Sequence, residues 1–145
     1  MTNFKKQKIS CCILGLGYIG LPTAALIAKT KNKVIGVDIN NEVVDIVNSG
    51  KVHIVEKGLQ NLVKDVVSEG YLYAQNKPSK ANVFILAVPT PLDKNKNGLP
   101  KPNIDYVLNA ANSISEFLKP GDLVILESTS PVGTTEKIAE LIYEK

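Results

Sequence analysis

A chain of 145 residues is long enough for one domain with a proper core, and its 44% hydrophobic and 21% charged residues exclude a disordered chain. The net charge of +3 is mild, and a nucleic-acid-binding protein normally shows a dense basic stripe. The lysines are scattered instead, at Lys5, Lys6, Lys8, Lys94, Lys96 and Lys101. We therefore expect no nucleic-acid partner.

No apolar stretch reaches the about 20 residues that a membrane helix needs. A basic N-terminus precedes an apolar run, but glycines interrupt that run. It is not typical of a signal peptide. We expect no membrane partner and a cytoplasmic location.

An alternation of apolar runs and amphipathic segments predicts strands and helices in turn. In chain order, we expect a strand over 8–14, a helix over 18–30, a strand over 33–38, helices over 41–48 and 58–69, strands over 71–74 and 83–88, a loop over 93–103, a helix over 104–118, a strand over 123–126 and a helix over 134–143. The strands over 83–88 and 123–126 are expected to be buried. Five strands with crossover helices predict an α/β fold with a Rossmann-type, doubly wound parallel sheet.

The two cysteines, Cys11 and Cys12, are adjacent in the first expected strand. Neighbouring strand residues point to opposite faces, so we expect no disulfide between them. Both are better explained as small buried side chains than as nucleophiles or metal ligands. The single histidine, His53, has no partner for a metal, and we expect no metal site.

A glycine pattern follows the first expected strand. Gly15, Gly17 and Gly20 form G-x-G-x-x-G where this strand turns into the first expected helix. Such a turn presents free backbone N–H groups and the positive end of a helix to an anion. In a dinucleotide site, Gly15 permits the tight turn, Gly17 lets the backbone approach the pyrophosphate, and Gly20 lets helix and strand pack closely.

Asp38 ends the second expected strand, 18 residues beyond Gly20. That distance suits one helix and a return strand, so Asp38 should lie beside the glycine turn. A carboxylate there accepts hydrogen bonds from the adenosine ribose and repels the 2′-phosphate of NADP. No Arg or Lys occurs in 39–41, which favours NAD over NADP. The alternative is that Asp38 only caps the helix that begins near Asn41.

Two further segments follow the fourth and fifth expected strands, at 88–91 and 127–133. In a parallel sheet of this kind, ligands bind beyond the carboxyl ends of the strands. Both segments contain hydroxyl groups and prolines, which can present rigid polar groups to a cofactor. The alternative is a pair of ordinary turns whose Ser and Thr side chains satisfy local backbone groups.

Taken together, the stretches GLGYIGLP, VIGVDIN, AVPTP and ESTSPVGTTE resemble the nucleotide-sugar 6-dehydrogenases, the UDP-glucose/GDP-mannose dehydrogenase family. The resemblance covers 8–140, and HIVEKGL with STSPVG is most similar to the UDP-N-acetyl-D-mannosamine dehydrogenases. It implies that 1–145 is an NAD-binding domain. It also implies that Tyr18, Ile19, Asp38, Thr90 and Thr129 contact the cofactor.

The same resemblance places Thr129 near the nicotinamide, implies that it helps to order a catalytic water, and assigns Glu127 to shaping that region. It implies that the C6 alcohol of a UDP-sugar is oxidised to a carboxylate, with two hydrides passed to two NAD molecules. A cysteine of the family holds the intermediate as a thiohemiacetal and then as a thioester.

That cysteine and the Lys and Asn that assist it lie beyond the last residue of this chain, as do a sixth strand, the dimerisation helix and the sugar-binding domain. We therefore expect no catalytic residue here, a fragment that is inactive alone, and a homodimer for the full-length enzyme. Two other hypotheses stay open. One is a stand-alone nucleotide-binding module without catalysis, which a downstream reading frame with a cysteine would argue against. The other is a different NAD-dependent dehydrogenase, against which the joint presence of VPTP and STSPVGTT counts.

Overall fold

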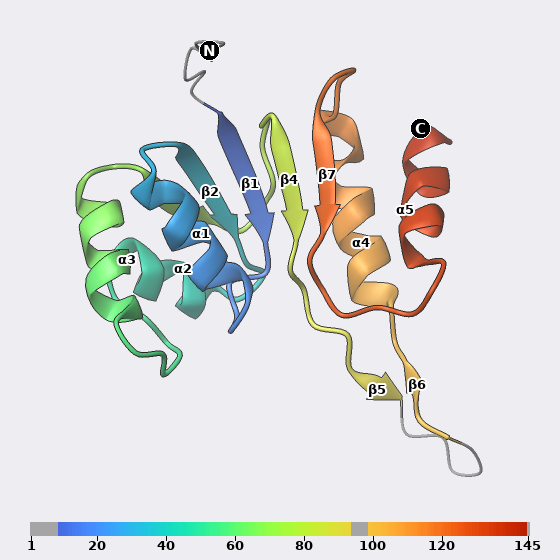
Figure 1. Ribbon diagram of the computed structural model, residues 1–145, viewed down its shortest axis with the longest axis horizontal. Helices are drawn as coiled ribbons and strands as arrows, with labels where there is room; N and C mark the ends of the chain where they lie inside the picture. Colours follow the sequence, from blue (N-terminus) through green and yellow to red (C-terminus); the bar gives the residue numbers. More distant parts are fainter. Residues whose placement is uncertain (1–8, 94–98, 145) are drawn as a thin grey trace, which may run out of the picture.

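The computed structural model describes residues 9–93 and 99–144, and in it a five-stranded parallel sheet lies between two layers of helices (Figure 1). The strand order is β3-β2-β1-β4-β7. The strands are β1 (Ser10–Leu14), β2 (Lys33–Val37), β3 (Leu72–Gln75), β4 (Val83–Leu86) and β7 (Leu123–Leu126). The expected Rossmann-type sheet is confirmed.

Each face of the sheet carries its own helices and its own apolar core. The helices α1 (Gly20–Lys29), α2 (Asn41–Asn48) and α3 (Leu59–Ser68) cover one face, and α4 (Asp105–Ile114) and α5 (Thr134–Tyr143) cover the other. Cys11 packs into the first core and Cys12 into the second. Both thiols are free and buried, as the alternation of side chains along a strand predicts.

Most elements agree with expectation to within one or two residues at their ends, and three features differ. The segment expected as a loop contains a short antiparallel ribbon, β5 (Leu92–Asp93) paired with β6 (Lys101–Pro102). The α-helix α4 ends at Ile114 and continues as a 3₁₀ turn, η1 (Ser115–Phe117), since Pro120 follows closely. Of the lysines named above, Lys5, Lys6, Lys8, Lys94 and Lys96 lie outside the described residues.

The third difference concerns β7, which we expected to be buried. Leu123 is 53% exposed and Ile125 is 38% exposed. The physical reason is that β7 is the last strand of the described sheet and only the α4–α5 layer covers it. The apolar composition of the strand was recognised correctly, but its burial on both faces was wrong.

The other edge strand, β3, is held by a side chain of α2. The Asn48 amide accepts a hydrogen bond from the Ala74 N–H at 2.8 Å and donates one to the Ala74 carbonyl at 2.8 Å. Asn48 thereby occupies both backbone groups that β3 would offer to another strand at this point, a recognised way of protecting a sheet edge.

Replacing this amide should reduce stability. We expect Asn48→Ala to lower the free energy of unfolding by about 1–3 kcal/mol, because two partly buried backbone groups lose their partner. Urea denaturation followed by circular dichroism measures the change. Asn61→Ala is the matched control, since Asn61 is exposed on α3 and makes no side-chain hydrogen bond to the described residues. Equal effects of the two substitutions would contradict the role given to Asn48.

Candidate functional site

The glycine turn follows β1, next to β4, at the point in the sheet where the strand order reverses. Gly15 has φ +92° and donates its N–H to the Val37 carbonyl at 2.8 Å. A Cβ on Gly15 would lie 2.6 Å from the Ala87 carbonyl oxygen, and one on Gly20 would overlap the Gly15 carbonyl oxygen. The structure therefore requires glycine at both positions, for the turn and for close packing respectively.

Gly17 differs from both. Its φ lies outside the left-handed region, and a Cβ there would meet no atom of the described protein within 4 Å. The N–H groups of Gly17, Tyr18 and Ile19 have no acceptor among the described residues, and the Tyr18 and Ile19 side chains are exposed. Three free donors beside an open space fit a bound anion.

The start of α1 also favours an anion beside the glycine turn. Its N-cap, Ile19, provides no side-chain hydrogen bond, and its first turn contains no acidic residue. By contrast, α2 is capped by the Asn40 side chain and has Glu42 in its first turn. The positive end of the α1 dipole is therefore not compensated by its own residues and can favour a phosphate group.

Asp38 lies directly beside the glycine turn. One carboxylate oxygen accepts a hydrogen bond from the Leu16 N–H at 3.0 Å, and the other accepts one from the Asn40 N–H at 2.9 Å. A carboxylate offers about four acceptor sites, so hydrogen-bonding capacity remains for hydroxyl groups of a ligand. The helix-capping alternative is wrong, because the N-cap of α2 is Asn40, whose side chain accepts from the Glu42 N–H at 2.9 Å.

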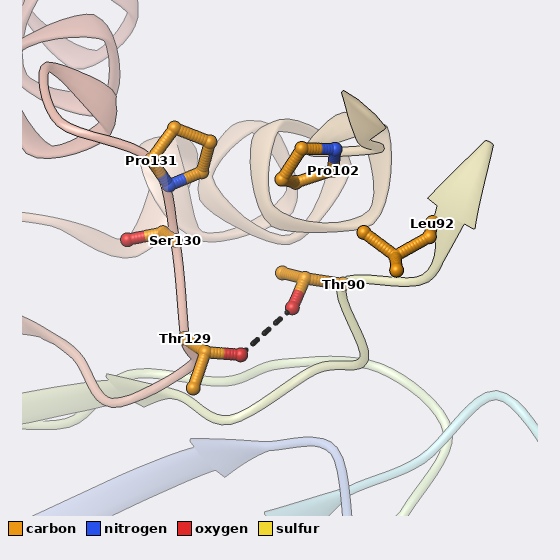
Figure 2. A pocket seen from close by; sticks show the side chains of 6 residues that line it. All are labelled: Thr90, Leu92, Pro102, Thr129, Ser130 and Pro131. Atoms are coloured by element: carbon orange, nitrogen blue, oxygen red, sulfur yellow. Dashed lines mark hydrogen bonds between the residues drawn. The ribbon is translucent and has the colours of Figure 1, made fainter. Parts of the chain in front are cut away.

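A second polar group lies beyond β4 and β7. The Thr90 and Thr129 hydroxyls point toward one another and are 3.1 Å apart (Figure 2). Both line a pocket of about 330 Å³, together with Leu92, Pro102, Ser130 and Pro131. This pocket is at the carboxyl edge of the sheet, where a parallel α/β fold places its ligands.

Two other hydroxyls of these segments bind backbone carbonyl groups of the protein. Ser128 donates to the Val88 carbonyl at 2.6 Å, and Thr134, which is buried, donates to the Pro131 carbonyl at 2.8 Å. The alternative of ordinary hydroxyl-satisfied turns thus describes Thr134, whereas Ser128 joins the segment after β7 to the segment after β4. It does not describe Thr90 and Thr129, whose hydroxyls bond each other across the pocket.

Three features of the site were not expected from the sequence. The ribbon supplies Leu92 and Pro102 to the pocket. The Asn76 amide donates to the Asp38 carbonyl at 3.0 Å, and the Thr23 hydroxyl donates to the Glu127 carboxylate at 2.9 Å. The contact of Asn76 could have been suspected, because Asn76 is a polar residue just after β3 and that strand ends at the same edge of the sheet as β1 and β2. Nothing in the local sequence indicates the other contacts.

No group of three or more His, Cys, Asp or Glu side chains in 9–93 and 99–144 is arranged to hold a metal ion. None of the helices in these ranges has the length and apolar character needed to cross a membrane.

The crossover of a doubly wound sheet, a glycine turn with free N–H groups and a carboxylate after β2 define a dinucleotide-binding domain. The chain belongs to the UDP-glucose/GDP-mannose dehydrogenase family, since the model of that family's NAD-binding domain matches residues 9–145. The cofactor of the domain is therefore NAD, as the sequence predicts.

Within this family, the chain is similar to curated UDP-N-acetyl-D-mannosamine dehydrogenases. The chain is 57% identical over 145 residues to the UDP-N-acetyl-D-mannosamine dehydrogenase of Campylobacter jejuni, covering 100% of this chain and 34% of that protein. It is 52% identical over 132 residues to the corresponding enzyme of Escherichia coli K12, covering 91% of this chain and 30% of that protein. The chain thus spans about a third of the length of these curated relatives.

Solved structures agree with this assignment. The UDP-N-acetyl-mannosamine dehydrogenase Cap5O of Staphylococcus aureus superposes with a TM-score of 0.86 at 38% identity, covering 93% of this chain and 32% of that one. The UDP-D-ManNAc dehydrogenase of Pyrococcus horikoshii gives 0.87 at 40% identity, covering 94% and 32%. At these identities the likeness extends beyond the fold to the family.

Proposed function

We propose that this chain is the cofactor-binding part of an enzyme that oxidises the C6 alcohol of a UDP-sugar to a carboxylate. The UDP-sugar that we propose as its substrate is UDP-N-acetyl-D-mannosamine. The whole of residues 1–145 acts as one NAD-binding domain. The observation that carries the proposal is the joint geometry of the glycine turn and Asp38. NAD, when bound, supplies the hydride acceptor.

The residues of the chain have separate roles in this proposal. The free N–H groups of Gly17, Tyr18 and Ile19 receive the pyrophosphate, with Gly15 and Gly20 shaping the turn. Asp38 accepts hydrogen bonds from the adenosine ribose with the acceptor capacity that Leu16 and Asn40 leave unused. The donors are backbone N–H groups, and the Asp38 carboxylate is held in place by the Leu16 and Asn40 N–H groups, so binding requires little ordering of the protein.

Thr90 and Thr129 complete the site at its other end. Their paired hydroxyls line the pocket beyond β4 and β7, and we assign this pocket to the nicotinamide half of the cofactor. Thr129 is exposed, and in this proposal its hydroxyl holds a water molecule near the reacting carbon. Binding and orientation are the contributions of this chain, because its cysteines are both buried in β1.

Selectivity for NAD over NADP tests the proposal. We expect calorimetric titration to give at least about tenfold tighter binding of NAD, or about 1.4 kcal/mol. The reason is that the Asp38 carboxylate repels a 2′-phosphate. Asp38→Ala should remove this preference and weaken NAD binding. Lys77→Ala is the control, because it removes a charged side chain that is exposed in the loop after β3. This variant should keep the preference for NAD over NADP unchanged.

The result that counts against the proposal is equal or tighter binding of NADP by the wild-type chain. A preference that survives in Asp38→Ala would show that another group repels the phosphate. Asp38→Asn gives a second check, because its amide keeps one acceptor and loses the charge. The stability of each variant is measured by thermal denaturation, since Asp38 also holds the Leu16 and Asn40 N–H groups.

We also propose that the complete enzyme is a cytoplasmic homodimer. Similarity to the family supports the assembly, and two free thiols in the structure suit a reducing compartment. The alternative of a stand-alone nucleotide-binding module would also bind NAD. Association of the chain with a sugar-binding domain that restores oxidation of the UDP-sugar would favour the enzyme over the module.

A further inference from the structure

Glu127 lies where the segment after β7 meets the helix of the glycine turn. Its Oε1 accepts a hydrogen bond from the Thr23 hydroxyl at 2.9 Å. Thr23 is in the first turn of α1, and its N–H bonds back to the Ile19 carbonyl at 3.2 Å. In the described part of the chain, no other side-chain hydrogen bond joins α1 to the segment that follows β7.

The direction of Glu127 follows from the alternation along β7. Val124 and Leu126 pack into the core under α4 and α5, whereas Leu123 and Ile125 are exposed on the opposite face. Glu127 continues the second set and so faces the α1 side of the sheet. No helix of the described residues covers β7 on that side, so the Glu127 carboxylate reaches α1 across an open surface.

Ser128 and Thr129, which follow Glu127, connect the Glu127–Thr23 contact to the pocket. Ser128 ties the same segment to β4, through its N–H to the Leu86 carbonyl at 3.1 Å and its hydroxyl to the Val88 carbonyl at 2.6 Å. Thr129 then meets Thr90 across the pocket. Ser128 therefore fixes Thr129 relative to β4, while Glu127 fixes it relative to the helix that begins at the glycine turn.

We propose that Glu127 is a positioning residue for the cofactor. By accepting from Thr23, it holds the Thr90–Thr129 pocket at a fixed place relative to the pyrophosphate-binding turn, so that one dinucleotide can occupy both. A site held in its bound geometry before the ligand arrives loses less entropy on binding. The inference rests on the proposed NAD site and adds the specific contact that couples its two ends.

The competing explanation is an ordinary surface hydrogen bond. Glu127 is exposed, and exposed polar pairs commonly contribute little to stability. The two explanations differ in what the contact affects. A surface contact alters stability slightly or not at all, whereas a positioning contact alters the binding of NAD but not of ADP, which lacks the nicotinamide half.

The test is calorimetric titration of the 145-residue chain with NAD and, separately, with ADP. We expect Glu127→Ala and Thr23→Val each to weaken NAD binding about three- to tenfold, the effect of one lost hydrogen bond. ADP binding should stay within about twofold of wild type in both. Glu127→Gln keeps an acceptor and Thr23→Ser keeps a donor, so these two variants should bind NAD nearly as wild type does.

Two additions make the test specific. The double variant E127A/T23V should bind NAD no more weakly than either single variant, because the two changes remove the same contact. Ser10→Ala is the control at the amino end of the sheet, where the Ser10 hydroxyl donates to the Asn82 side chain at 2.9 Å. It removes a comparable hydrogen bond and should leave NAD affinity unchanged.

Each outcome has a defined meaning. Unchanged NAD affinity in E127A and T23V would overturn the inference and leave the NAD site intact, as would equal losses for NAD and ADP. A loss in E127Q as large as in E127A would assign the effect to charge and overturn the positioning role. If the wild-type chain bound neither ADP nor NAD, the proposed function would fail first, and this inference with it. Should E127A not fold, T23V tests the same contact from the other side.

Discussion

Gly17→Val is expected to abolish NAD binding while the chain stays folded. The open space beside Gly17 and the free N–H groups next to it are the features on which the expectation depends. A Cβ at this position meets no atom of the described protein within 4 Å, so we expect the fold to tolerate a side chain there. The same side chain would occupy the space in which the pyrophosphate approaches the backbone. We expect a loss of at least about a hundredfold in affinity, or about 2.8 kcal/mol.

Calorimetry measures the affinity of this variant, and circular dichroism with thermal denaturation measures its fold. Gly20→Ala is the informative contrast. Its Cβ would overlap the Gly15 carbonyl oxygen, so we expect it to reduce stability by about 1–3 kcal/mol or more, as overpacked sites do. Normal NAD binding by Gly17→Val would mean that the pyrophosphate lies elsewhere, and the assignment of the turn would be wrong.

The features that could be predicted from the sequence have short-range causes. The strand β7 (Leu123–Leu126) and the helices α2 (Asn41–Asn48) and α5 (Thr134–Tyr143) have the bounds that were expected. Apolar runs and helical spacing indicate these segments directly, because each pattern lies within a few consecutive residues. The glycine turn was predictable for the same reason: strand, turn and helix are contiguous in the chain.

Features that depend on distant neighbours could not be predicted. The ribbon of β5 and β6 consists of two-residue strands that contain a proline and charged residues, so it has no periodicity to detect. The exposure of Ile125 depends on which helices lie over the last strand. Thr23 and Glu127 are 104 residues apart in the chain, and only the folded sheet brings them together.

The site itself shows the same division. That Asp38 would lie beside the glycine turn could be argued from the length of one helix and one strand. That its two oxygens hold the Leu16 and Asn40 N–H groups could not, because the hydrogen bonds depend on the exact path of the turn. This double role makes Asp38 a structural residue as well as a proposed ribose ligand, and stability has to be measured alongside affinity.

The two cysteines should behave as inert core residues. Cys11 and Cys12 are 5% and 0% exposed. Burial raises the pKa of both thiols, and for Cys12 it does so to about 11, although a backbone hydrogen bond from Ser79 lowers it in part. The thiolate is the nucleophile, and a raised pKa keeps the thiol protonated at neutral pH. We expect iodoacetamide at neutral pH to modify neither thiol in the folded chain and both in urea.

The same chemistry predicts that the 145-residue chain alone does not oxidise a UDP-sugar. Resemblance to the family implies a cysteine that forms a covalent intermediate, and the two cysteines of this sequence lie in β1, before the glycine turn and away from the Thr90–Thr129 pocket. The family's thiol acts only after the first hydride has left the C6 alcohol, so a chain without it could at most oxidise the alcohol to the aldehyde, and only with the sugar bound. The resemblance assigns sugar binding to a separate domain, so the positioning contribution to the rate is lost as well. Incubation with NAD and UDP-N-acetylmannosamine should therefore give no steady rise in NADH absorbance, even when titration shows that NAD is bound. Steady NADH production that persists in C11A/C12A would contradict this expectation, because the chain would then bind and oxidise the sugar without either thiol. NAD binding without turnover is instead the result expected of a chain that positions the cofactor while both of its thiols are buried in β1.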